Sequence, residues 1–306
     1  MKKGELIGVT GASGFVGSHL ISGLLKEGYK VRALVRSEEK GGRLKEQGCE
    51  VATGDVRDLA SLERAFQGVQ AVIHLVAITR EKGDTNFETV NRLGTKNVCE
   101  AMKKNGVSRL VYTSIVRAGP EVKSAYLRSK WAAEQEIRKS ELDWTILRCS
   151  FIFGAGGNAL ETLASMIRRL PIVPVLGDGK YKQQPIFVKD VVSCLIKSLE
   201  EDKTVRNVYE IGGPEPLEYN QILDAIGEAL GKKRRKLHLP LAINRPLIAI
   251  GERILPKPLI TIPELELLIM DPIPEKNVIK EVFGIDPLPL REVLKKTFKE
   301  KAKTPV

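Results

Sequence analysis

The stretch "LIGVTGASGFVGSHLISGLL", residues 6–25, decides the fold class of this chain. It passes from a short β-rich run through a glycine turn into an amphipathic helical pattern. Gly11, Gly14 and Gly17 follow one another in this turn at a three-residue spacing. Glycine lets the bare backbone approach a pyrophosphate, and the unpaired N–H groups and positive dipole at the start of the helix favour an anion. Because the turn joins the first strand to a helix, it predicts a dinucleotide-binding site.

In the first 150 residues, short β-rich runs alternate with helical patterns. Runs such as "AVIHLVA" (71–77) are almost continuously apolar, which is typical of parallel strands that are buried on both faces. The alternation predicts βαβ crossovers and an α/β fold, a doubly wound parallel sheet of the Rossmann type with helices on both faces. The predicted strands are 6–10, 30–36, 50–54, 71–77, 109–114 and 143–148.

After residue 150 the alternation becomes irregular, and glycine and proline become frequent. We interpret residues 1–150 as the NAD(P)-binding domain and residues 151–306 as a smaller C-terminal substrate lobe. Late strands of the sheet are expected from about 185–213, where "PIFV" and "NVYEIGG" are β-rich.

Composition indicates an ordinary globular protein, with 42% hydrophobic and 28% charged residues. The four cysteines stand alone, without a C-x-x-C pair, which argues against a zinc site and a disulfide framework and favours a reducing cytoplasm. Charged residues and prolines interrupt the most apolar segment, 239–270, so it is not expected to span a bilayer.

The net charge of +11 comes largely from "GKKRRKL" (231–237) and from the C-terminal tail. Basic runs of this kind serve nucleic acid, anionic lipid or acidic partners, or simply form a solvated face. No aromatic residues interleave with these runs as a base-stacking surface requires, so nucleic acid is not expected as a partner. Peripheral contact with a membrane or a membrane complex stays open.

The end of the second predicted strand, "ALVRSEEK", bears on the choice of cofactor. An acidic residue there takes the ribose hydroxyls of NAD, whereas an arginine accommodates the extra phosphate of NADP. The position holds Arg36, with Arg32 upstream on the same strand, and therefore favours NADP. NAD stays an alternative because Glu38 and Glu39 follow closely.

Two further strand ends are candidates for contact with the cofactor. In "TGDVRD", Asp55 could accept from the adenine amino group and Val56 could flank the ring. In "HLVA", Leu75, Val76 and Ala77 lie where the fourth strand is expected to meet the crevice. For the apolar residues, plain core packing is an equal alternative.

Tyr126 and Lys130 lie four residues apart in "SAYLRSKWAAEQ", on the same face of a predicted helix. Many helices offer such a pair without any function. Following the glycine turn and the fifth strand in this order, however, the pair favours catalytic chemistry.

With both features, the chain resembles the short-chain dehydrogenase/reductase superfamily, in its extended, epimerase-like branch. Details such as "YLRSKWAAEQ" and the late "LPLAINRP" are similar to an atypical group that includes the nucleotide-binding accessory subunit of respiratory complex I and its bacterial relatives. The resemblance covers nearly the whole chain and is carried by "TGASGFVGSHL", "GDVRD", "VNRLGTKNV", "VYTS", "YLRSK", "LDWTILRCSFIFG", "PIFVKDVV" and "YEIGGPEPL".

The resemblance implies a role for each residue of the pair and for three others. Tyr126 would transfer a proton while hydride moves to or from the cofactor, and Lys130 would hold the nicotinamide ribose. The ammonium and the positive nicotinamide ring would lower the pKa of the phenol from its usual value of about 10. Ser114, with Thr113 as its rival, would hydrogen-bond the substrate oxygen, and Asn91 would brace the site.

Two departures from the branch stand out. Only 12 positions separate Ser114 from Tyr126, so the loop over the substrate is clipped. Cys149 replaces a frequent proline, which leaves the nicotinamide geometry open, and no histidine pairs evidently with it as a nucleophile would require. The residues predicted to contact the cofactor are Gly11, Ser13, Gly14, Phe15, Val16, Gly17, Arg36, Asp55, Val56, Leu75, Val76, Ala77, Tyr126, Lys130, Cys149, Phe151 and Ile152.

Three functions compete. The first is an NADP(H)-dependent oxidoreductase acting on a carbonyl or alcohol of a small, hydrophobic substrate. The second is a nucleotide-sugar epimerase or dehydratase, and the third is a non-catalytic NADP(H)-binding subunit or sensor that docks on a membrane complex. His19, His74 and His238 are interpreted as structural, and no metal is expected. A monomer or homodimer in the cytoplasm, with peripheral membrane contact as an option, fits all three.

Overall fold

The computed structural model describes residues 1–255 and 260–303. The chain forms two compact units. The cofactor unit comprises Met1–Cys149, Lys189–Ile211 and Asn277–Ile285, and the lobe unit comprises Ser150–Val188, Gly212–Lys276 and Asp286–Val306. The chain leaves the cofactor unit after Cys149, beside the boundary predicted near residue 150.

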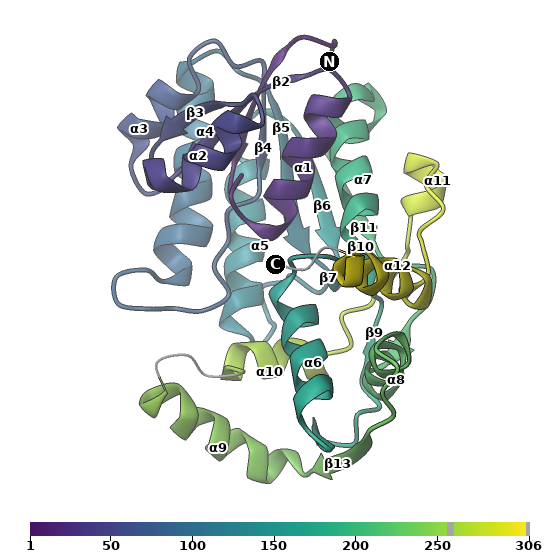
Figure 1. Ribbon diagram of the computed structural model, residues 1–306. Coiled ribbons are helices and arrows are strands. Elements are labelled where there is room, and N and C mark those ends of the chain that lie inside the picture. The colour runs from purple at the N-terminus through teal and green to yellow at the C-terminus, as the bar shows by residue number, and fades with distance from the viewer. Residues whose placement is uncertain (256–259, 304–306) are drawn as a thin grey trace. The chain divides into compact units, whose positions relative to one another are not determined.

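A seven-stranded parallel sheet forms the centre of the cofactor unit (Figure 1), as the sequence predicts. Its order is β11-β6-β5-β4-β1-β2-β3. The chain reverses direction beside β1, and in doubly wound sheets ligands bind at the carboxyl ends of the strands near such a reversal. The strands are β1 (Leu6–Thr10), β2 (Lys30–Val35), β3 (Glu50–Thr53), β4 (Ala71–His74), β5 (Arg109–Ile115), β6 (Asp143–Cys149) and β11 (Asn207–Ile211).

Helices cover both faces of this sheet, which explains why its central strands are apolar on both sides. On one face, α3 (Leu59–Ala65), α4 (Leu93–Lys104) and α5 (Ala125–Arg138) share a core with β4, β5 and β6. On the other face lie α1 (Phe15–Lys26) and α7 (Val188–Glu200), packed so closely that a Cβ at Gly23 would lie 2.8 Å from Val192. The helix α2 (Glu38–Glu46) packs against β2 and β3.

Two late segments return to the cofactor unit. The strand β11, from the predicted "NVYEIGG", pairs with β6 at the sheet edge. A second return, Asn277–Ile285 with the short helix α11 (Ile279–Phe283), is not evident in the sequence. Its Val278 N–H donates to the carbonyl oxygen of Glu210 over 3.2 Å.

The expectation that "PIFV" joins the main sheet is wrong. The strand β10 (Ile186–Phe187) pairs in parallel with β7 (Ile152–Phe153), within the lobe unit. The Ile186 N–H donates to the Phe151 carbonyl oxygen over 2.9 Å, so the two strands meet through packing between segments that are distant in the sequence. Apolar composition predicts that such a segment is buried, but does not say which strand it pairs with.

The lobe unit is built from short strand pairs and helices around a core of its own. The pairs are β7 with β10, β9 (Lys182–Gln183) with β12 (Leu217–Glu218), and β8 (Ile172–Leu176) with β13 (Arg235–Leu239). The helices are α6 (Asn158–Arg169), α8 (Tyr219–Ala229), α9 (Leu241–Ile254), α10 (Ile262–Ile269) and α12 (Leu290–Lys303). Apolar residues of α6, α8 and α12 fill the core.

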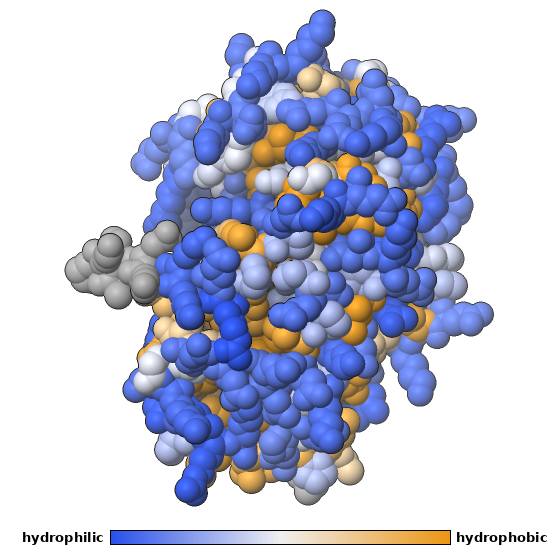
Figure 2. Space-filling view, turned by 90° about the vertical axis from the view of Figure 1, so that its right-hand side faces the viewer, coloured by the Kyte–Doolittle hydropathy of each residue, from blue (hydrophilic) through white to orange (hydrophobic). Residues whose placement is uncertain are grey.

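The face drawn in Figure 2 carries mostly hydrophilic side chains, with apolar residues in scattered groups. Among the residues that the structure describes, no helix has both the length and the apolar character that crossing a bilayer requires.

Candidate functional site

The glycine turn has the geometry that a pyrophosphate requires. Gly11 has a φ of +73°, in the left-handed region that favours glycine. A Cβ at Gly17 would overlap the carbonyl oxygens of Gly11 and Ala12, so the close passage of the turn over the helix excludes any side chain there. The helix α1 begins after Gly14 without a side-chain cap, which leaves its first N–H groups available to an anion.

A cavity of about 220 Å³ lies beside this turn. The carboxyl ends of β1, β2, β3 and β4 supply its walls, as expected for a doubly wound sheet. Nine of the predicted cofactor residues come together there: Gly11, Ser13, Gly14, Arg36, Asp55, Val56, Leu75, Val76 and Ala77. The predicted strand 71–77 ends early, at His74, so Leu75, Val76 and Ala77 leave the sheet and line the cavity.

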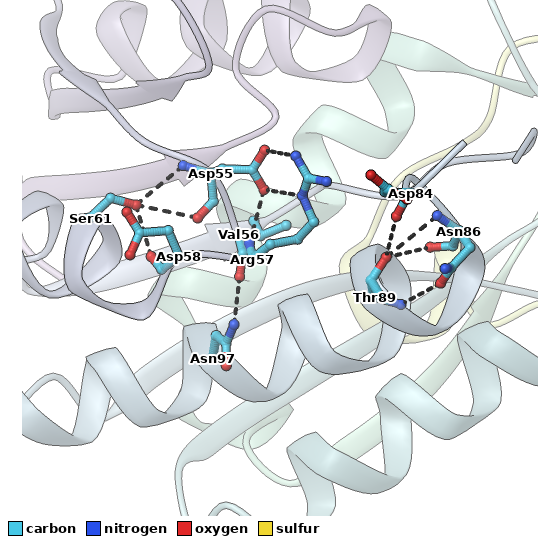
Figure 3. A network of polar contacts seen from close by, with 9 residues as sticks. All are labelled: Asp55, Val56, Arg57, Asp58, Ser61, Asp84, Asn86, Thr89 and Asn97. Atoms are coloured by element: carbon cyan, nitrogen blue, oxygen red, sulfur yellow. Dashed lines mark hydrogen bonds and ion pairs between the residues drawn. The ribbon is translucent and has the colours of Figure 1, made fainter. Parts of the chain in front are cut away.

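Two guanidinium groups lie at the cavity, Arg36 and Arg57. Figure 3 shows the carboxylate of Asp55 holding Arg57, with distances of 3.0 Å to Nε and 2.8 Å to Nη2. The pKa of Asp55 is lowered chiefly by its hydrogen bond with Arg57, with a smaller contribution from the charge of Arg36. Asp55 therefore acts first as the anchor of an arginine. Among the described residues, neither Glu38 nor Glu39 lines the cavity.

Arg57 also lies near the loop that closes this end of the site (Figure 3). The hydrogen bond with Asp55 raises the pKa of Arg57, and the charge of Asp84 adds a smaller rise. The loop is held by its own hydrogen bonds, since the Thr89 N–H donates to Asn86 Oδ1 over 2.8 Å. Arg32, by contrast, is unavailable to a cofactor because it pairs with Glu50 at 2.7 Å.

Tyr126 and Lys130 lie one turn apart on α5, and both are buried, with exposed fractions of 9% and 2%. Lys130 Nζ donates to the Thr113 carbonyl oxygen over 2.8 Å and lies 4.2 Å from the centre of the Tyr112 ring. Thr113 is near the carboxyl end of β5. The lysine is thus fixed at the edge of the sheet where ligands of this fold bind.

The pKa values of the pair differ from the simple expectation. Burial raises the pKa of Tyr126 to about 12, and the charge of Cys149 adds to the rise. Burial lowers the pKa of Lys130 to about 7, against the opposing effects of Glu134 and Cys149. In the chain without cofactor, therefore, desolvation dominates the pKa values of both groups, and the pKa of Tyr126 is raised where the resemblance implies a lowered value.

Asn91 connects the loop after β4 to α5. It is fully buried in a π-helical turn, Glu88–Arg92, a rare element that is frequent at functional sites. Its Oδ1 accepts from the Ile78 N–H over 2.9 Å, and its Nδ2 donates to Ser129 Oγ over 2.9 Å. Ser129 Oγ in turn donates to the Tyr126 carbonyl oxygen over 2.6 Å. Asn91 thereby positions the backbone that carries Tyr126.

Ser114 lies beside a buried ion pair between α5 and β6. Its Oγ donates to Glu134 Oε1 over 2.6 Å, and Glu134 is fully buried. Arg148 binds the same carboxylate through Nε at 2.9 Å and Nη2 at 2.8 Å. Ser114 belongs to this buried ion pair, a structural role that satisfies the carboxylate. Its rival Thr113 contributes its backbone carbonyl, to Lys130.

The remaining predicted residues are distributed as follows. Phe15 and Val16 form the first turn of α1, next to the glycine turn. Cys149 ends β6, and burial raises the pKa of its thiol to about 12, which keeps it protonated at neutral pH and argues against a nucleophile. Phe151 and Ile152 belong to the lobe unit.

The structure gives each histidine an environment that accounts for it. His74 is fully buried between Thr10 Oγ1 at 2.6 Å and Thr95 Oγ1 at 3.0 Å, and burial, with the charge of Lys130, lowers its pKa to about 3. His19 packs edge-on against Phe15, and His238 lies 3.2 Å from Asn220 Oδ1.

Sequence reasoning missed Arg57, Ser129, Glu134 and Arg148. Arg57 lies in the motif "GDVRD", two residues after Asp55, and Glu134 lies in "YLRSKWAAEQ", four residues after Lys130. This short spacing is the feature of the sequence that could have identified them. The pairing of Glu134 with Arg148 joins a helix to a strand and depends on the tertiary fold. No local pattern reveals it.

Comparison with known proteins agrees with this geometry. The mitochondrial NADH dehydrogenase (ubiquinone) 1 alpha subcomplex subunit 9 of Arabidopsis thaliana is 27% identical over 248 residues, which cover 79% of this chain and 62% of that protein. The chain thus spans less than two thirds of that relative. A ceramide reductase of Caulobacter vibrioides is 27% identical over 242 residues, covering 77% of this chain and 74% of the reductase.

The fold recurs in a UDP-glucose 4-epimerase from Thermotoga maritima, with a TM-score of 0.75, 23% identity and coverage of 97% and 99% of the two chains. The model of the family described as NAD(P)H-binding matches residues 11–165, which contain the glycine turn, the cavity and the Tyr126–Lys130 pair. This chain therefore belongs to the NAD(P)H-binding family, in which it fits the extended branch of the short-chain dehydrogenases/reductases.

Proposed function

We propose that this protein is an NADP(H)-dependent oxidoreductase that acts on a carbonyl or alcohol of a small, hydrophobic substrate. The observation that carries the proposal is the buried pair of Tyr126 and Lys130 on α5, fixed to the carboxyl end of β5 in an NAD(P)H-binding unit. Two neighbouring groups whose pKa values are shifted in opposite directions are typical of acid–base sites.

Tyr126 and Lys130 have different proposed roles. The bound cofactor supplies or accepts the hydride. Tyr126 would hold and move the proton at its phenol oxygen, and its raised pKa keeps the phenol protonated, the form from which carbonyl reduction starts. Lys130, held by the Thr113 carbonyl, would donate to the nicotinamide ribose, and in its protonated form it would stabilise the phenolate. Ser114 is not part of this proposal, because Glu134 accepts its hydrogen bond.

NADP(H) is proposed over NAD(H) because the cavity at the end of β2 holds two guanidinium groups. Arg36 and Arg57 both line it, and arginine forks match phosphate oxygens well. The ion pair with Asp55 holds the guanidinium group of Arg57 in a fixed orientation before the cofactor binds. A free ribose hydroxyl would gain less from this positive environment than a phosphate.

Two observations support a hydrophobic substrate. The relative from Caulobacter vibrioides is a ceramide reductase. The lobe unit also carries many apolar residues in the segment 239–270, of which residues 256–259 lie outside the described part of the chain.

The experiment is a comparison of Tyr126→Phe with Tyr209→Phe. Oxidation of NADPH would be followed with a panel of long-chain and aromatic ketones and aldehydes. Tyr126→Phe should abolish turnover and leave NADPH affinity unchanged, whereas Tyr209→Phe, which loses a 3.3 Å hydrogen bond on the edge strand β11, should retain turnover. Turnover by Tyr126→Phe at the wild-type rate would refute the assignment.

A second candidate is a non-catalytic NADP(H)-binding subunit. Relatives of this chain are subunits of NADH dehydrogenase in Arabidopsis thaliana and Neurospora crassa, which favours it. It predicts tight NADPH binding with no turnover in the wild type. The epimerase alternative rests on shared fold and residues alone. Its test is a thermal-shift screen with sugar nucleotides. These ligands should raise the melting temperature of an epimerase and leave that of an oxidoreductase of hydrophobic substrates unchanged.

A further inference from the structure

The helix α9 of the lobe unit exposes a row of large apolar side chains. Leu247, Ile250 and Ile254 are 58%, 53% and 72% exposed, far more than such residues usually are. They are spaced by three and four positions and so lie along one face of the helix. The row continues into Leu255, which is also exposed.

Two polar side chains of α9 hold the helix to the lobe unit. Asn244 is buried, and its Nδ2 donates to the Leu239 carbonyl oxygen over 2.8 Å. Glu252 Oε1 accepts from the Ile262 N–H at the start of α10 over 3.0 Å. The helix is therefore anchored through Asn244 and Glu252, while Leu247, Ile250 and Ile254 stay exposed.

The neighbouring strand pair extends the same kind of surface. On β8 and β13, Ile172 and Leu237 are 50% and 52% exposed, while Val173 and Val175 turn inward and are buried. Because side chains alternate along a strand, Arg235 shares the outer face with Leu237. Only Pro240 separates β13 from α9, so exposed apolar residues run from the strand pair directly into the helix.

The charge of this surface is strongly positive. Residues 231–255 contain seven lysines and arginines against one acidic residue, Glu252; of the seven, Lys236 pairs with Asp224 and Arg245 with Glu266. Lys232 and Lys233 are exposed on the turn before β13. An apolar row flanked by basic side chains is the pattern of an interfacial amphipathic helix.

We propose that α9, together with the outer face of β8 and β13, is a docking surface for a bilayer that contains anionic phospholipid. The apolar row would enter the boundary between headgroups and acyl chains, and Lys232, Lys233 and Arg235 would face the lipid phosphates. With 14 residues, α9 is about 21 Å long, shorter than the roughly 30 Å of the hydrocarbon core, so it lies along the interface.

A second copy of the chain fits this surface less well. A two-fold interface brings the same residues of both copies face to face. Because Lys232, Lys233 and Arg235 are exposed on this surface, such an interface would bring like charges together. Anionic lipid supplies the complementary charge.

The test is co-sedimentation of the full chain with vesicles of phosphatidylcholine and phosphatidylglycerol in equal parts. The wild type should partition into these vesicles, and less into phosphatidylcholine alone or at high salt. Leu247→Ser/Ile254→Ser removes apolar contact without changing charge, and Lys232→Glu/Lys233→Glu reverses two charges. Each double variant should lower the partition coefficient at least about tenfold.

Matched controls carry the same changes elsewhere. Leu93→Ser alters an exposed leucine of α4, and Lys26→Glu/Lys139→Glu reverses two exposed lysines of the cofactor unit. These controls should partition like the wild type, and all variants should retain NADPH binding as proof of folding. Equal losses in variants and controls would overturn the proposal. So would a wild-type dimer that Leu247→Ser/Ile254→Ser converts to a monomer, without any vesicle binding.

Discussion

The two ends of the proposed cofactor site work by different physical means. At the glycine turn, the backbone alone shapes the site, and no titratable side chain is involved among Gly11, Gly14 and Gly17. On α5, the site depends on two buried titratable groups, Tyr126 and Lys130, whose pKa values are set by desolvation. At the glycine turn, cofactor binding should therefore be sensitive to larger side chains and insensitive to pH. At α5, stability and turnover should be sensitive to pH and to the loss of a titratable side chain.

The largest effect should come from adding atoms at the glycine turn. Gly17→Val would force a side chain into the carbonyl oxygens of Gly11 and Ala12, which are backbone and cannot move aside. We expect NADPH binding, measured by fluorescence titration, to fall below detection. Gly42→Ala, on α2 with open space around it, is the control and should bind normally. Normal binding by Gly17→Val would remove the basis for a backbone-shaped phosphate site.

The next prediction concerns the pH dependence of stability, to which Lys130 should contribute. Burial lowers the pKa of Lys130 from 10.5 to about 7. Between these values the unfolded chain binds a proton that the folded chain lacks, so Lys130 should make the free energy of unfolding rise with pH from about 7 to about 10. Tyr126, whose pKa rises from 10.0 to about 12, opposes this only above about pH 10.

Urea unfolding of the wild type and of Lys130→Met at several pH values measures this contribution. The wild type should gain stability relative to the variant as the pH rises through that window, and below about pH 7 the difference should level off. Parallel pH profiles would show that Lys130 is not desolvated in the folded chain.

A smaller effect is expected at the arginine end of the cavity. Arg36→Asp replaces a guanidinium by a carboxylate and should weaken NADP(H) relative to NAD(H) by roughly 10- to 100-fold. Isothermal titration with both cofactors gives the ratio. Arg32→Ala is the matched control, since Arg32 pairs with Glu50, and it should leave the ratio unchanged. A ratio that does not move in Arg36→Asp would mean that another residue reads the ribose.

The smallest effect on turnover should come from Ser114. Ser114→Ala removes one hydrogen bond to the buried Glu134 and should cost about 1 kcal/mol of stability. Since Arg148 still pairs with that carboxylate, turnover should fall less than about tenfold. A loss of activity as large as that of Tyr126→Phe, without loss of stability, would show that Ser114 acts on the substrate directly.

The sequence predicts one part of this molecule far better than the other. Strand–helix alternation and the glycine spacing are local patterns, and they predict the seven-stranded unit and the residues around its cavity. The pairing of β10 with β7 and the return of Asn277–Ile285 depend on long-range packing, and neither is encoded in a local period.

The candidate site divides in the same way. Arg36, Asp55 and Leu75 could be predicted to lie together because the carboxyl ends of parallel strands meet at one edge. The partner of Ser114 could not, because Glu134 lies 20 residues further along the chain and reaches Ser114 only when α5 packs on the sheet. The pKa of Tyr126 could not either, since it depends on burial, which a sequence does not measure.

The most direct test of the account is a titration of the Tyr126 phenol with and without NADP⁺, read from the phenolate absorbance of the wild type minus that of Tyr126→Phe. Without cofactor the pKa should be near the value of about 12 that burial imposes. With NADP⁺ bound, the positive nicotinamide ring should favour the phenolate and lower the pKa well below that value. If the pKa stays at about 12 with NADP⁺ bound, the cofactor does not reach this tyrosine, and the proposed catalytic role is contradicted.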